Sequence, residues 1–170
     1  MNTVNYQIEL LSQHPQKKTF TCGIEVLDRY LQQQASQDMK RYAASTYVML
    51  DIQTQDIIGY YSLAATSIVS ADLPEMIAKK LPKYLSLPAT LLGRLAVANS
   101  YQGKNFGKVL LINALKRSLE LSLQIASFAV VVDAKDETAT KFYKHHDFLP
   151  LNEHARKLFL PMTTIKQIEF

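Results

Sequence analysis

The segment Gln102–Lys108 carries the residue types needed to hold a phosphate group. It precedes a stretch with helical periodicity, and the free backbone N–H groups at a helix N-terminus point toward whatever lies in front of them. The helix dipole favours an anion there by about 0.3–1 kcal/mol. Gly103 and Gly107 allow close backbone approach, and Lys104 and Lys108 add positive charge. A plain glycine-containing turn before an ordinary helix has the same features, so the loop alone leaves both interpretations open.

Arg94 is the second residue that could do chemistry, because it lies inside the otherwise apolar segment Leu91–Val97. A guanidinium group in apolar surroundings is costly unless it is paired with a carboxylate or a phosphate. Arg94 therefore either contacts a phosphodiester of the substrate or closes an internal ion pair. The sequence favours neither.

The histidines and the cysteine indicate no further chemistry. His145 and His146 are adjacent but lack a third ligand at a recognisable spacing, so we expect exposed helix residues and no metal site. Cys22 is the single cysteine, which excludes an internal disulfide and suits a reducing cytoplasm. No base partner for it is evident, so we expect a buried thiol rather than a nucleophile.

The spacing of apolar residues predicts the elements that position these groups. We expect a helix over 24–39 capped by Thr21, a hairpin, a short helix and, after an irregular connection bracketed by Pro82 and Pro88, a strand. A polar loop, an amphipathic helix whose apolar face runs from Val109 to Leu123, a strand, another helix and two strands follow. The expected ranges are 46–51 and 57–69 for the hairpin, 74–80 for the short helix, 90–97 for the strand and 98–105 for the polar loop. After the amphipathic helix they are 127–133 for the strand, 137–146 for the helix, and 148–151 and 158–160 for the last two strands.

This order predicts a mixed α/β sheet with helices on both faces. The chain has 170 residues and shows no repeats or linker-like stretches, so we expect one domain over 1–170. No apolar run approaches a membrane span and the N-terminus lacks a signal-peptide pattern, so a cytoplasmic location is expected. The net charge of +4 fits a polyanionic partner and a solubilising surface equally well.

Two motifs resemble the acetyl-CoA-dependent GNAT acetyltransferases. The family's Gln/Arg-x-x-Gly-x-Gly/Ala signature is matched by Gln102 and Gly107, with Asn105 in place of the first glycine. Its Asn/Asp-x-x-Ala-x-x-Phe-Tyr-x-x-x-Gly-Phe pattern is matched except that Asp147 replaces the glycine; the matching residues are Asp136, Ala139, Phe142, Tyr143 and Phe148. Asn and Asp are among the non-glycine residues that tolerate positive φ, so we expect both loops to keep their shape.

Longer strings are similar to the GNAT toxins of bacterial type II toxin–antitoxin modules, over nearly the whole chain. They are Phe20–Gly23, Gly59–Leu63, Leu91–Val97 and Leu158–Met162. The resemblance implies transfer of acetyl from acetyl-CoA to the α-amino group of aminoacyl-tRNA, which stops translation. It also implies neutralisation by a ribbon-helix-helix antitoxin that brings operator DNA into the complex, and it leaves a homodimer open.

The resemblance assigns a fold and roles to residues of this chain. The fold is the GNAT fold, a mixed and mostly antiparallel sheet with a splayed central strand. Tyr143 stands at the position of the general acid. Arg94 is a candidate for substrate binding on the charge argument given above, not on the resemblance. Acetyl-CoA contacts fall to Leu95, Ala96, Val97, Gln102, Gly103, Lys104, Asn105, Phe106, Gly107, Lys108, Asp136 and Phe142.

Two alternatives remain at this point. A GNAT enzyme could instead act on a small amine, a polyamine or a peptide N-terminus, because fold alone does not decide substrate. A non-catalytic GNAT-like binding module is the other, and only the replaced glycines at Asn105 and Asp147 argue for it.

Overall fold

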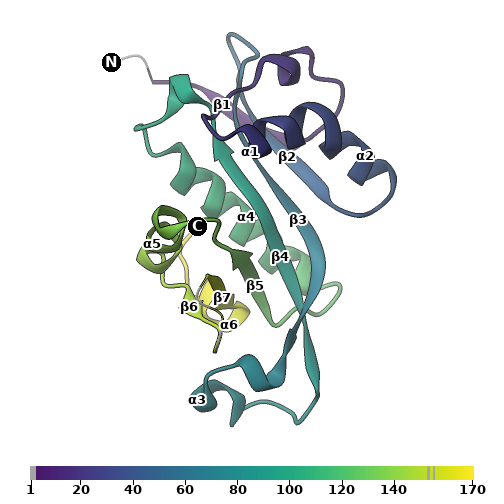
Figure 1. Cartoon of the computed structure of the whole chain (residues 1–170), viewed down its shortest axis with the longest axis vertical. Coiled ribbons are helices and arrows are strands. Elements are labelled where there is room, and N and C mark those ends of the chain that lie inside the picture. Colours follow the sequence, from purple (N-terminus) through teal and green to yellow (C-terminus); the bar gives the residue numbers. More distant parts are fainter. Residues whose placement is uncertain (1–2, 153, 155) are drawn as a thin grey trace. The chain divides into compact units, whose positions relative to one another are not determined.

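The computed structural model describes residues 3–152, 154 and 156–170 (Figure 1). Its strands form one seven-stranded sheet in the order β1-β2-β3-β4-β5-β7-β6. The strands are β1 (Tyr6–Leu10), β2 (Ser45–Asp51), β3 (Ile57–Val69), β4 (Ser86–Val97), β5 (Ala129–Asp133), β6 (Leu149–Pro150) and β7 (Lys157–Pro161). The α-helices are α1 (Glu25–Arg29), α2 (Ala35–Lys40), α3 (Glu75–Ala78), α4 (Phe106–Ser122), α5 (Glu137–His145) and α6 (Met162–Ile165). Short helical turns are η1 (Pro15–Thr19), η2 (Tyr30–Gln34), η3 (Ser70–Asp72) and η4 (Asn99–Tyr101).

The chain divides into two compact units. The first comprises Met1–Ala64 and Gly93–Ala114, and the second comprises Ala65–Leu92 and Leu115–Phe170. The β4–β5 pairing is parallel, whereas β1–β2, β2–β3, β5–β7 and β6–β7 are antiparallel. The predicted mixed, mostly antiparallel sheet is therefore confirmed. No helix in the described part of the chain is long and apolar enough to cross a membrane.

In the first unit, neighbouring residues of β3 face opposite sides of the sheet, as the two-residue period of a strand requires. The Tyr60 hydroxyl donates to the Leu27 carbonyl oxygen on α1 at 2.7 Å, and the Tyr61 hydroxyl donates to Asn113 Oδ1 on α4 at 2.6 Å. A Cβ at Gly59 would lie 2.5 Å from the Ala96 carbonyl oxygen and 2.8 Å from Leu110 Cδ1. Helices therefore cover both faces of this part of the sheet, as predicted, and Gly59 allows the close approach.

The helix predicted over 24–39 is present as α1, η2 and α2, with η2 a π-helical turn in the middle. Its buried face includes Leu27, Leu31 and Ala35, as the periodicity predicts. The predicted Thr21 cap is wrong. The N-cap position is Ile24, and the Thr21 hydroxyl instead donates to Asp28 Oδ2 at 3.2 Å.

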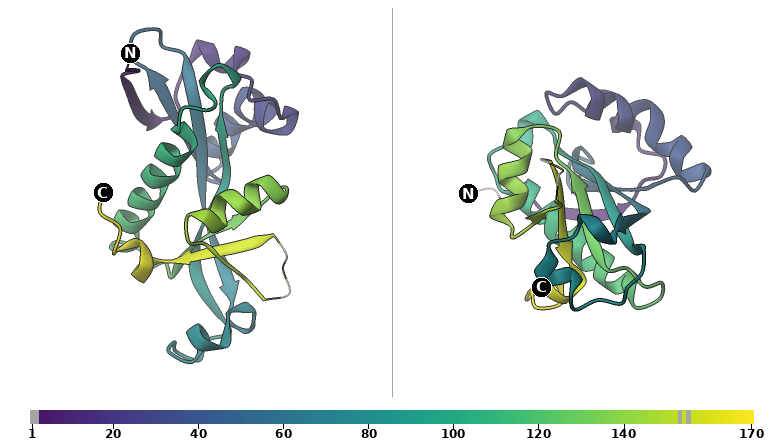
Figure 2. Two further views of the ribbon diagram at one scale, coloured as in Figure 1. Left: turned by 90° about the vertical axis from the view of Figure 1, so that its left-hand side faces the viewer. Right: turned by 60° about the horizontal axis from the view of Figure 1, so that its bottom comes forward.

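The second unit is built on β5 and β7, which pair antiparallel from Ala129↔Pro161 to Asp133↔Lys157. β5 is buried along most of its length, and Ala129 and Val131 belong to a core cluster with Phe159. α3 lies in the connection between β3 and β4 (Figure 2). Its Ile77 is partly buried and packs against the same cluster.

Two expectations about element boundaries need correction, and one strand was not predicted. Pro88 does not border an irregular connection but lies inside β4, where its carbonyl oxygen accepts from Phe128 N–H at 2.7 Å. Leu123 follows the end of α4 and is 86% exposed, so it is not part of the apolar helix face. β1 was not predicted; it is the edge strand beside β2 and is largely exposed.

Candidate active site

The loop before α4 presents a run of unsatisfied backbone donors. The N–H groups of residues 103–108 have no acceptor in the described part of the chain, whereas Gln102 N–H donates to Asn99 and Val109 N–H donates to Asn105. All residues of the run except Phe106 and Gly107 are exposed. α4 begins at Phe106 and is 17 residues long, so its dipole is directed at this loop. The arrangement is that of an anion-binding site made of backbone.

The conformation of this loop depends on two residues in the left-handed region. Gly103 has φ 78° and Asn105 has φ 67°, which confirms the prediction that Asn105 supports the shape normally given by glycine. A Cβ at Gly103 would meet nothing within 4 Å, so only the backbone angle favours glycine there.

Side chains of the loop mainly fix its position. Gln102 Nε2 donates to the carbonyl oxygens of Cys22 and Val97, both at 2.9 Å. The ring of Phe106 is buried and makes an edge contact with Tyr101 at 6.0 Å between centroids. Gln102 and Phe106 therefore hold the loop, and the exposed backbone remains available to a ligand.

Arg94, on β4, forms no ion pair with any described residue. Its guanidinium carbon instead lies 3.5 Å from the centroid of the Tyr30 ring, a close cation–π contact. The guanidinium N–H groups of Arg94 have no hydrogen-bond acceptor among the described residues. Of the two interpretations of Arg94, the internal ion pair is absent among the described residues.

Sequence reasoning missed Tyr30, which supports Arg94. The Tyr30 hydroxyl donates to Asp38 Oδ2 at 2.8 Å, and Gln34 Nε2 donates to Asp38 Oδ1 at 2.9 Å. Burial and the bond to Asp38 raise the pKa of Tyr30, while the bonds from Gln34 and Tyr30 lower the pKa of Asp38. Tyr30 begins a π-helical turn over residues 30–34, a feature that is common at functional sites. The spacing of apolar residues in the sequence does not reveal such a turn, so Tyr30 could not be found from it.

Tyr143 lies on α5, with its ring enclosed by Phe142 at 5.2 Å and Phe148 at 5.3 Å between centroids. Its side chain is 8% exposed, and burial raises the pKa of its phenol well above the ordinary value. Its hydroxyl bonds to no described residue. Tyr143 therefore offers a buried, protonated phenol whose hydroxyl has no acceptor among the described residues.

The other predicted residues near Tyr143 shape α5. Asp136 caps the helix, since its Oδ1 accepts from Ala139 N–H at 2.8 Å, and Phe142 packs between Tyr143 and His146. Asp147 has φ 70°, which confirms the prediction that an aspartate here adopts the left-handed conformation of the replaced glycine. The first unit thus holds the loop, residues 95–97 and Arg94, and the second holds Asp136, Phe142 and Tyr143.

The remaining predicted groups have ordinary surroundings. His145 is exposed, and its ring lies 5.1 Å from that of His146. Within the described ranges no three His, Cys, Asp or Glu residues gather as a metal site. Cys22 is buried, as predicted, with Sγ 3.7 Å from the Ile24 carbonyl oxygen. The described pairing of β4 with β5 joins Thr90 to Val130 and Leu91 to Val131. Residues 95–97 of β4 lie beyond these pairs.

Comparison with known proteins places these features in a family. The model of the acetyltransferase (GNAT) family matches residues 14–148. The probable toxin TacT of Sinorhizobium fredii is 30% identical over 159 residues, which cover 89% of this chain and 88% of the relative. A tRNA-acetylating toxin of Mycobacterium tuberculosis is 32% identical over 130 residues, 76% of each chain.

Two solved structures share the fold closely. AtaT complexed with acetyl-methionyl-tRNAfMet has a TM-score of 0.89 at 29% identity, covering 95% of this chain and 98% of that one. A tyrosine-to-phenylalanine mutant of the AtaT toxin, bound to the C-terminus of the antitoxin AtaR and to acetyl-CoA, has a TM-score of 0.80 at 25% identity, covering 95% and 96%. The sheet order, the donor loop before α4 and the family match together identify this chain as a member of the acetyltransferase (GNAT) family.

Proposed function

We propose that this protein transfers the acetyl group of acetyl-CoA to the α-amino group of aminoacyl-tRNA and thereby stops translation. The observation that carries the proposal is the similarity of nearly the whole chain to AtaT, solved with acetyl-methionyl-tRNAfMet. The relative named as a tRNA-acetylating toxin supports the same substrate. We further propose that residues 1–170 act as one domain, because the family match runs through both compact units.

The residues of the loop fit the pyrophosphate of acetyl-CoA. The unsatisfied N–H groups of residues 103–108 and the N-terminus of α4 supply donors and a favourable dipole, and Lys104 and Lys108 supply charge. We assign the pantetheine arm to the backbone of Leu95, Ala96 and Val97, with further contacts from Asp136 and Phe142. When bound, acetyl-CoA supplies the thioester that the amine attacks.

The substrate amine needs little activation by the protein. A free α-amino group has a pKa of about 7.7–8.0, and the electron-withdrawing ester of an aminoacyl-tRNA lowers it further. The amine is therefore largely neutral at cellular pH and attacks the thioester carbonyl directly, which explains why no strong base is required.

The leaving thiolate does need a proton, and we assign that role to Tyr143. The ordinary pKa of a tyrosine is about 10 and burial raises that of Tyr143 further, so the hydroxyl is protonated at neutral pH and available as a donor. General acid catalysis of this kind typically contributes about 10²–10⁴-fold. Arg94, whose guanidinium N–H groups have no acceptor among the described residues, is assigned to a phosphate of the tRNA.

Partners and location follow from the same proposal. A ribbon-helix-helix antitoxin would neutralise the enzyme and link it to operator DNA, as supported by the AtaT structure with the C-terminus of the antitoxin AtaR. Its substrate would place the protein in the cytoplasm.

Labelled acetyl-CoA tests the proposal directly. We expect label on aminoacyl-tRNA and none on the same tRNA after deacylation. Label on free amino acids, polyamines or peptides but never on aminoacyl-tRNA would establish the alternative small-amine enzyme. If the folded protein binds acetyl-CoA but transfers label to no amine, the alternative of a non-catalytic GNAT-like binding module would be favoured.

A further inference from the structure

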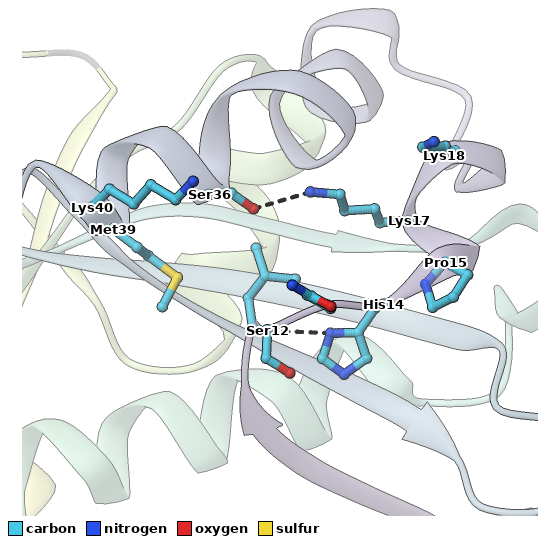
Figure 3. A pocket seen from close by; sticks show the side chains of 10 residues that line it. Ser12, His14, Pro15, Lys17, Lys18, Ser36, Met39 and Lys40 are labelled. Carbon is cyan, nitrogen blue, oxygen red and sulfur yellow. Dashed lines mark hydrogen bonds between the residues drawn. The ribbon is translucent and has the colours of Figure 1, made fainter.

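A pocket of about 610 Å³ lies in the first unit between the β1–η1 segment and α2 (Figure 3). Its volume is in the range of small-molecule sites. Its lining combines an apolar wall with three ammonium groups; the apolar residues are Leu11, Pro15 and Met39, and the basic residues are Lys17, Lys18 and Lys40. No residue of the loop at 102–108 lines it, so it is separate from the acetyl-CoA site.

The three lysines of this pocket have no carboxylate partner among the described residues. Lys17 Nζ donates to Ser36 Oγ at 3.0 Å, and Lys40 points its ammonium group toward the same hydroxyl from the other side (Figure 3). Lys18 and Lys40 make no hydrogen bond or ion pair within the described structure. Like charges held around one pocket repel each other, and a bound anion would offset that repulsion.

His14 braces the segment that presents Lys17 and Lys18. Ser12 N–H donates to His14 Nδ1 at 3.2 Å, so the ring proton is on Nε2, which lies 2.8 Å from Glu9 Oε1 and donates to it. The His14 side chain is only 10% exposed. Binding of an anion falls to the lysines, while His14 and Glu9 fix the chain that carries two of them.

The apolar side chains of the pocket favour an anion that also carries an apolar surface. Leu11 is 4% exposed and belongs to the core, and Met39 packs against the same cluster. A free phosphate ion would use the ammonium groups and leave this wall uncovered. A nucleotide unit uses both, with the phosphate on the lysines and the sugar or base face on the wall.

We infer that this pocket binds one nucleotide unit of an RNA strand through its phosphodiester, outside the acetyl-transfer site. The inference rests on the proposed function, since aminoacyl-tRNA would supply the strand. Phosphate contacts of this type position a nucleic acid without reading its sequence, and lysines serve them as point charges. The pocket therefore helps to hold any tRNA and does not select among tRNAs.

The test compares two double variants that lose the same charge. Lys18→Ala/Lys40→Ala removes the two pocket lysines that make no hydrogen bond or ion pair with a described residue. Lys83→Ala/Lys166→Ala removes two exposed lysines of the second unit. Binding of deacylated tRNA is measured at several chloride concentrations, with acetyl-CoA affinity as the check on folding. We expect the pocket variant to bind about tenfold more weakly, and its salt slope to fall by roughly 1 for each lost phosphate contact.

Three results would overturn the inference. The first is a pocket variant that keeps the wild-type salt slope of tRNA binding. The second is a control variant that loses as much tRNA affinity as the pocket variant does. The third is a Lys18→Arg/Lys40→Arg variant, which keeps both charges, that binds tRNA as weakly as the alanine variant. Inorganic phosphate, compared with chloride at equal ionic strength, separates the sources. Tight competition by phosphate with RNA binding unchanged in the pocket variant would assign the pocket to the free ion. Failure of the proposed function would appear differently, as wild-type protein that leaves aminoacyl-tRNA unlabelled.

Discussion

The loop at 102–108 and the helix α5 differ in the groups that they offer to a ligand. The loop uses its backbone: the N–H groups of residues 103–108 have no acceptor among the described residues, and the Gln102 side chain ties the loop to the carbonyl oxygens of Cys22 and Val97. α5 works with one side-chain atom, the Tyr143 hydroxyl, while Asp136 and Phe142 cap and pack the helix. The first site should therefore be sensitive to backbone shape and charge, and the second to loss of a single oxygen.

Tyr143→Phe is the change with the largest expected effect. It keeps the ring contacts with Phe142 and Phe148 and removes a hydroxyl that bonds to no described residue, so folding and acetyl-CoA affinity should hardly change. Loss of the general acid should lower turnover by about 10²–10⁴-fold. Steady-state kinetics with aminoacyl-tRNA measures this, and turnover within about twofold of wild type would mean that water or another group supplies the proton.

The pH dependence of the wild-type enzyme sharpens the same contrast. The active form needs a neutral amine and a protonated phenol. Rate should rise with pH through the pKa of the amine and then stay level, because burial raises the pKa of Tyr143 above its ordinary value. A fall in kcat/KM between pH 8 and about 9, well below the usual tyrosine pKa of about 10, would contradict a buried tyrosine as the acid.

Gly107→Glu should break the loop while leaving the fold intact. Glycine is a poor helix former and a carboxylate is favourable in the first turn of a helix, so α4 should tolerate the change. The new charge would face the phosphates, and acetyl-CoA affinity should fall about tenfold or more, ~1.4 kcal/mol. Calorimetry measures this, with Gly107→Ala as the control that adds a Cβ without charge. Unchanged affinity in folded Gly107→Glu would remove the loop from the cofactor site.

Features that depend on a residue and its near neighbours in the sequence could be predicted, whereas those that depend on contacts between distant segments could not. β5 and α4 were predicted well because their apolar residues are buried in regular patterns. β1 was missed because an edge strand that is mostly exposed carries little hydrophobic alternation. Thr21 looked like a helix cap, but its hydroxyl is used by Asp28, a contact set by the path of the chain.

The site shows the same division. Asn105 and Asp147 could be predicted as left-handed positions, since that preference belongs to the residue type. The contact of Arg94 with Tyr30 could not, because it joins residues far apart in the chain. The use of Gln102 to hold the loop is equally non-local, and a motif match alone suggests a ligand contact instead.

The smallest expected effects come from those two left-handed residues, at φ 67° for Asn105 and 70° for Asp147. Alanine is strained at such an angle, so Asn105→Ala and Asp147→Ala should each lower the free energy of unfolding by about 1 kcal/mol. Glycine at either position should keep the free energy of unfolding closer to wild type than alanine does, because glycine adopts positive φ without the Cβ penalty. Only the Asn105 substitution should also weaken acetyl-CoA binding, a few-fold, because that residue shapes the donor loop whereas Asp147 follows α5. Denaturant unfolding and calorimetry on the four variants separate the two effects. If Asn105→Gly weakens acetyl-CoA as much as Asn105→Ala does, then the amide side chain rather than the backbone angle serves the ligand, and the loop is not the backbone site described above.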